Sequence, residues 1–88
     1  MRSQLLTARA AALFAGDLPT DSNPSALAVD NAITIAVRRY GGTRGCVARM
    51  AAAYGDYPET ACHRMRWARR VVEAAYQPHP ATQELIAA

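Results

Sequence analysis

The sequence contains no lysine, one tryptophan, one phenylalanine and only two cysteines among its 88 residues. Small disulfide-stabilised domains need several paired cysteines, so this chain is expected to fold around an apolar core in a reducing compartment. No apolar run approaches the roughly 20 residues of a membrane-spanning helix. The N-terminal apolar run is interrupted by Arg9 and is too short for a signal peptide. We therefore expect a cytoplasmic protein without membrane contact.

The sequence also lacks the alternation of apolar and polar residues that is typical of β-strands. Its apolar residues recur instead at spacings of three and four, and alanine, a strong helix former, is abundant. The pattern predicts an all-α fold, a compact bundle of four helices in a single domain over residues 1–76. A proline-containing tail with a short helix is expected over residues 77–88. Larger residues are expected to form the core: Leu6, Leu13, Phe14, Val29, Ile33, Val37, Met50, Tyr54, Met65 and Val72.

Glycine, proline and capping residues set the expected helix ends. We predict helices over residues 3–15, 24–40, 44–54 and 57–76. Each end has a residue suited to it. Gly16 is expected to end the first helix. Asn23 caps the second helix, which Gly41-Gly42 end, and Thr43 caps the third helix, which a left-handed Gly55 ends. Asp56 caps the fourth helix, with Glu59 as its capping-box partner.

All ten cationic residues apart from histidine are arginines, and most of them lie between residues 38 and 70. The acidic residues of that segment are Asp56 and Glu59 alone. The positive charge is therefore concentrated on one half of the chain, where an anionic partner would meet it.

The last two predicted helices, joined by a tight Gly-Asp turn, have the pattern of a helix-turn-helix module. On a helical wheel, one face of the fourth helix is apolar and is expected to pack in the core: Ala61, Met65, Ala68, Val72 and Ala75. The opposite side carries polar and aromatic residues suited to reading DNA. We predict that Thr60, His63, Arg64 and Trp67 enter the major groove of double-stranded DNA, and that Arg44, Arg66, Arg69 and Arg70 hold phosphates.

Residues 43–70 also resemble the helix-turn-helix of bacterial regulators. Ala51 and Gly55 have the expected four-residue separation, and with one extra residue in the turn Tyr57, Cys62 and Met65 take the buried anchor positions. The resemblance implies a regulatory or architectural DNA-binding protein. Because a single such module binds weakly, we expect a homodimer. The segment GDYPETACHRMRW further resembles a motif of short uncharacterised proteins from high-GC bacteria, which implies no activity.

Two alternatives to DNA binding stay open: a basic face that is merely solvated, and a protein-interaction module. In the second, the Trp67–arginine face or the Ala-rich first helix would dock a partner, since exposed tryptophan often marks an interface. Taken alone, Trp67 is expected to pack against the first helix or a dimer partner rather than to contact DNA. The spacing of the cysteines and histidines matches no zinc pattern. The chain also lacks a phosphate-binding glycine loop and a thiol with an orienting carboxylate nearby. We therefore expect no metal, no cofactor and no enzymatic activity.

Overall fold

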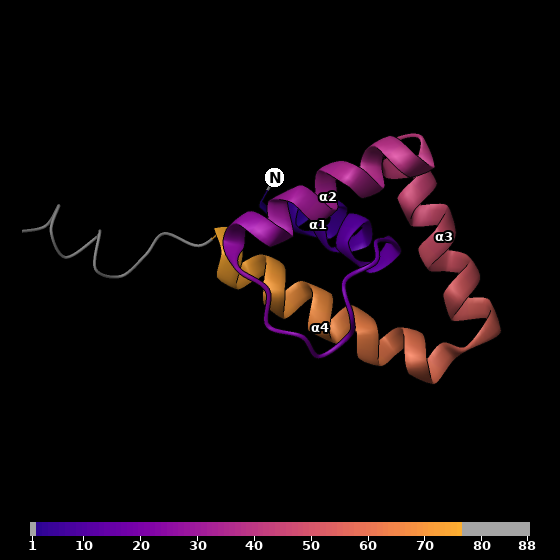
Figure 1. Ribbon diagram of the computed structural model, residues 1–88. Helices are drawn as coiled ribbons and strands as arrows, with labels where there is room; N and C mark the ends of the chain where they lie inside the picture. Colours follow the sequence, from indigo (N-terminus) through magenta and orange to yellow (C-terminus); the bar gives the residue numbers. More distant parts are fainter. Residues whose placement is uncertain (1, 77–88) are drawn as a thin grey trace, which may run out of the picture.

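The computed structural model describes residues 2–76 of the chain. This part consists of four helices without a strand: α1 (Arg2–Ala15), α2 (Ala26–Tyr40), α3 (Thr43–Asp56) and α4 (Pro58–Tyr76), all packed against one another (Figure 1). The predicted all-α bundle of four helices is confirmed. The tail over 77–88, with its expected short helix, lies outside the described residues.

The C-terminal half of α1 is the centre of the molecule. Residues 10–15 are buried on every side of the helix, none more than 9% exposed. A helix that is apolar all round requires neighbours all round, and α1 packs against α2, α3 and α4. Most of these side chains are methyl groups, which let the neighbours approach closely. The Ala-rich stretch of the first helix is therefore core, and these residues are not available to a partner.

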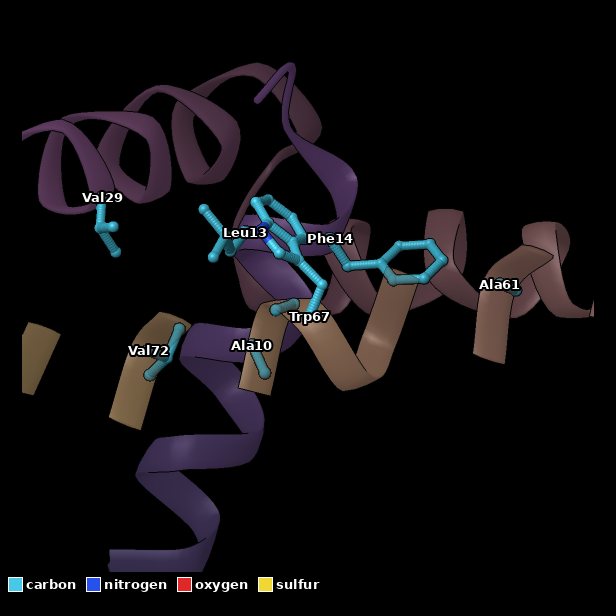
Figure 2. Close-up of a cluster of buried hydrophobic side chains, with 8 residues drawn as sticks. Ala10, Leu13, Phe14, Val29, Ala61, Trp67 and Val72 are labelled. Atoms are coloured by element: carbon cyan, nitrogen blue, oxygen red, sulfur yellow. The ribbon is translucent and has the colours of Figure 1, made fainter. Parts of the chain in front are cut away.

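The main core cluster joins α1, α2 and α4. Trp67 and Leu13 lie at its centre, and Phe14 extends toward Ala61 on the neighbouring helix (Figure 2). Nearly all the predicted core residues are buried or pack against the buried clusters. The exception is Tyr54, which is 36% exposed although its ring stacks on that of Phe14.

Helix α2 ends where the sequence predicts and begins slightly later. Gly41 adopts a left-handed conformation with φ of 77°, and the N–H of Gly42 donates a 2.7 Å hydrogen bond to the carbonyl oxygen of Val37. This is the glycine-terminated helix end that the pair was expected to form. At the other end Ser25, rather than Asn23, is the cap, because its side-chain oxygen accepts a 3.1 Å hydrogen bond from the N–H of Ala28.

The junction between α3 and α4 differs from the predicted Gly-Asp turn. Helix α3 continues through Gly55 to Asp56, and Gly55 has no positive φ. The predicted left-handed exit and the Asp56 cap are therefore wrong. Likewise Gly42, and not Thr43, precedes the first residue of α3.

Tyr57 alone separates α3 from α4. Its φ is −142°, and its carbonyl oxygen accepts a 2.9 Å hydrogen bond from the N–H of Ala61. Pro58 occupies the first helical position of α4, where a missing N–H costs nothing. A proline also drives the preceding residue out of the α region. The direction of α4 is thus set by the Tyr57-Pro58 pair.

Gly45 is required for the packing of α3 against the end of α2. A Cβ atom on Gly45 would overlap the carbonyl oxygen of Tyr40 and lie 2.6 Å from its carbonyl carbon. Because the obstacle is backbone, one of the two helices would have to shift. We expect Gly45→Ala to lower the free energy of unfolding by about 2–3 kcal/mol, measured by urea denaturation.

The matched control is Gly55→Ala, the same substitution in the same helix. A Cβ atom on Gly55 meets nothing within 4 Å. Because its backbone is helical, alanine should stabilise the protein there by about 0.5–1 kcal/mol. Equal effects of the two substitutions would contradict the close approach of Gly45 to α2.

Candidate nucleic-acid interface

The loop between α1 and α2, residues 16–25, crosses the side of α4 that the sequence assigns to DNA (Figure 1). Trp67 is 1% exposed, and its Nε1 donates a 2.8 Å hydrogen bond to the carbonyl oxygen of Ser22 in this loop. The placement of Trp67 on an outward strip is therefore wrong, whereas its packing against the first helix is confirmed. An indole is long enough to reach the core from the flank of a helix, and the loop covers the part of the ring that does not enter the core.

Arg64 caps the C-terminus of α1 instead of facing solvent. Its Nε donates a 2.8 Å hydrogen bond to the carbonyl oxygen of Phe14, and its Nη2 donates one of 3.0 Å to that of Gly16. Its Nη1 binds Oγ1 of Thr20 at 2.7 Å. The last carbonyls of a helix lack partners within it, and a cation there also suits the helix dipole. Burial lowers the pKa of the Arg64 guanidinium. Arg64 is thus committed to the fold and is not available to a groove.

His63 and Thr60 remain exposed, but the setting of His63 is not cationic. Nε2 of His63 lies 2.9 Å from both carboxylate oxygens of Asp21. Asp21 has a φ of 69°, the left-handed conformation that aspartate tolerates better than most residues. The loop therefore places a carboxylate beside the histidine that was expected to contact a base.

The first turn of α4 carries a further negative charge. Glu59 lies in the first turn of α4, and Asp56, the last residue of α3, is separated from α4 by Tyr57 alone. In helix-turn-helix modules it is the N-terminal residues of the recognition helix that contact base edges. Carboxylates at that end oppose the approach of phosphates, so the charge of α4 does not favour insertion by its N-terminus.

Arg66, Arg69 and Arg70 form the exposed cationic surface of α4, here called the α4 arginine face. All three are exposed, at spacings of three and four residues. Within the part of the chain that the structure describes, none of them has a hydrogen bond, an ion pair or a ring contact. Cys62 is also exposed, and its place four residues before Arg66 puts it on the same face.

Most other arginines are engaged within the fold. The contacts pair Arg9 with the ring of Tyr76 at 3.7 Å, Arg39 with Asp17 at 2.9 Å, and Arg49 with the ring of Tyr40 at 4.5 Å. Arg44 is exposed in the first turn of α3, at the end of that helix remote from α4 (Figure 1). The structure therefore brings Arg66, Arg69 and Arg70 together and leaves Arg44 apart from them.

The anchor residues of the helix-turn-helix resemblance are only partly buried. Met65 packs against the core, whereas Tyr57 is 70% exposed and Cys62 is also exposed. The expectation that Tyr57 and Cys62 are buried is wrong. The buried thiol is that of Cys46, and burial raises its pKa, which makes it a poor nucleophile.

No protein-family model, curated protein or solved structure matches the chain. Among residues 2–76, no three histidine, cysteine or acidic side chains gather where they could hold a metal ion. No helix in the same part of the chain is long and apolar enough to cross a membrane. The candidate site therefore rests on the geometry of α4 and of the loop beside it.

Proposed function

We propose that the protein binds double-stranded DNA through phosphate contacts of the α4 arginine face. One observation supports this: Arg66, Arg69 and Arg70 are exposed on one helix and have no partner among residues 2–76. Adjacent like charges on a helix repel one another by a few tenths of a kcal/mol unless an anion lies nearby. The planar guanidinium group is well matched to phosphate oxygens. The surface is thus suited to a polyanion.

The proposed binding does not depend on DNA sequence. Of the residues expected to read bases, Trp67 is buried, Arg64 caps α1 and His63 faces Asp21. Contacts to phosphates position a protein on DNA but carry no sequence information. We therefore assign an architectural role rather than the recognition of an operator. Three contacts bind weakly, so a homodimer that doubles them is part of the proposal.

A salt titration of binding to a mixed-sequence duplex tests the proposal. Each phosphate contact contributes about −0.9 to the slope of log Kobs against log salt concentration, so three contacts per protomer give about −5.4 for the proposed dimer. Replacing Arg66, Arg69 or Arg70 with glutamine should make the slope shallower by about 1.8 per substitution, because both protomers of the dimer lose the contact. Duplexes of unrelated sequence should bind with nearly equal affinity.

Arg38→Gln is the control for this titration. Arg38 is exposed in the last turn of α2 and carries the same charge, but it lies on a different helix. Its loss should leave the salt slope unchanged. An equal decrease for Arg38→Gln would indicate a general charge effect, and a strong preference for one duplex would indicate base reading. Both results contradict the proposal.

A protein-interaction module is the second candidate, favoured by the exposed apolar side chains of α2. Leu27 is 71% and Ile35 is 59% exposed. Ile35 borders a hollow of about 360 Å³ that is also lined by Leu18, Ala28 and Ala32. Contiguous exposed apolar surface of this kind is suited to another protein. A protein that binds no duplex at low salt would favour this candidate over DNA binding.

A further inference from the structure

A second hollow, of about 300 Å³, opens between the C-terminal ends of α1 and α2 and the junction of α3 with α4. Phe14 and Ala61, which are buried, and Ala53, which is half-buried, give it an apolar floor. The exposed residues Tyr57 and Thr60 stand at its rim. Its volume is at the lower end of small-molecule sites, which suits a ligand of about ten non-hydrogen atoms.

Arg49 provides a cationic group at this rim. Its guanidinium lies 4.5 Å from the centroid of the Tyr40 ring and has no ion pair within residues 2–76. A guanidinium stacked on a ring face keeps the N–H donors at its edges available. Asp17 also lines the hollow, and its carboxylate is paired with Arg39 at 2.9 Å. The hollow therefore combines an apolar floor with a positive edge.

We propose that this hollow binds a small carboxylate with a compact apolar body, such as an aromatic acid. The body lies on Phe14 and on the methyl groups of Ala53 and Ala61, and the carboxylate accepts hydrogen bonds from Arg49. An inorganic anion would leave the floor unused, and a neutral ring would leave the guanidinium unused. The site shares no residue with the α4 arginine face, so it is independent of the proposed DNA binding.

Benzoate is the probe, titrated into the isotope-labelled full chain and followed by amide chemical shifts. We expect saturable shifts at Phe14, Ala53 and Ala61 with a dissociation constant in the millimolar range, as is usual for ligands of this size. Benzamide keeps the ring without the charge, and acetate keeps the charge without the ring. Each should bind at least about tenfold more weakly than benzoate, because each loses one half of the contact.

Variants at the hollow separate its two halves. Arg49→Gln should weaken benzoate binding at least about tenfold, and Arg49 is exposed, so the fold should tolerate the change. Ala53→Leu should fill the hollow and abolish the saturable shifts, while the dispersion of the amide spectrum reports that the fold is retained. Arg38→Gln, with the same loss of charge on the exposed side of α2, should leave benzoate binding unchanged.

The results also distinguish this site from DNA binding. A variant in which Arg66, Arg69 and Arg70 are all glutamine should lose duplex binding yet bind benzoate as before. Equal affinity for benzamide, insensitivity to Arg49→Gln, or shifts confined to the α4 arginine face would each overturn the proposal of a carboxylate site.

Discussion

Replacing Trp67 with alanine is expected to lower the free energy of unfolding by about 4 kcal/mol, the largest effect of any single substitution proposed for this protein. The indole is 1% exposed and is the largest fully buried side chain. Its removal would leave a cavity between α1 and α4, and the carbonyl oxygen of Ser22 would lose its donor. A small domain is stable by only about 5–15 kcal/mol, so the variant should unfold at far lower urea concentration.

Far-UV circular dichroism is the appropriate measurement, because the variant lacks the only tryptophan. Trp67→Phe is the matched control, since it keeps much of the ring volume but loses the hydrogen bond to Ser22. We expect Trp67→Phe to cost about 1–2 kcal/mol and to leave duplex binding unchanged in the folded protein. Trp67→Ala within 1 kcal/mol of the parent would instead mean that the indole lies on the surface.

The helices could be predicted from the sequence because their signals are local. The glycine pair after Tyr40 can adopt positive φ, and both Gly41 and Gly42 do so. The core residues recur at helical spacing, and most of them pack as expected. Such features depend on residues within one or two turns of each other, which is the range that a periodicity argument covers.

The turn between α3 and α4 was predicted wrongly because two local signals compete there. Gly55 followed by Asp56 suits a helix end, yet the restriction that Pro58 imposes falls on Tyr57. With the break fixed at Tyr57, Gly55 and Asp56 remain helical. A proline at the first helical position is therefore a stronger marker of this junction than the capping pattern before it.

The candidate site was predicted less well than the fold because its residues depend on contacts across the chain. Trp67 and Arg64 bind the loop over 16–25, more than forty residues earlier in the sequence. No local pattern signals such contacts. A helical wheel gives the direction of a side chain, but it shows neither how far the side chain reaches nor which other segment packs over it. Composition identifies an arginine-rich helix, but only the tertiary contacts separate the arginines of the fold from Arg66, Arg69 and Arg70.

Arg64→Ala is expected to lower the free energy of unfolding by about 3 kcal/mol. The carbonyl oxygens of Phe14 and Gly16 and the hydroxyl of Thr20 would lose a charged donor, and the terminus of α1 would lose its cation. The guanidinium also lies 4.9 Å from the centroid of the Trp67 ring. Arg64→Lys should restore only part of the stability, because an ammonium group cannot reproduce the guanidinium fork.

Arg66→Ala is the matched control for Arg64→Ala in urea denaturation. Arg66 lies two residues away on the same helix but is exposed and has no partner in the described part of the chain, so its loss should change stability by less than about 0.5 kcal/mol. The two variants should therefore show opposite patterns in stability and in the salt dependence of duplex binding. Arg64→Ala should lose stability and, while folded, keep its salt slope for duplex DNA, whereas Arg66→Ala should keep stability and lose about 1.8 of the slope of the dimer. The reverse pattern would place Arg64 in the interface and remove it from the end of α1.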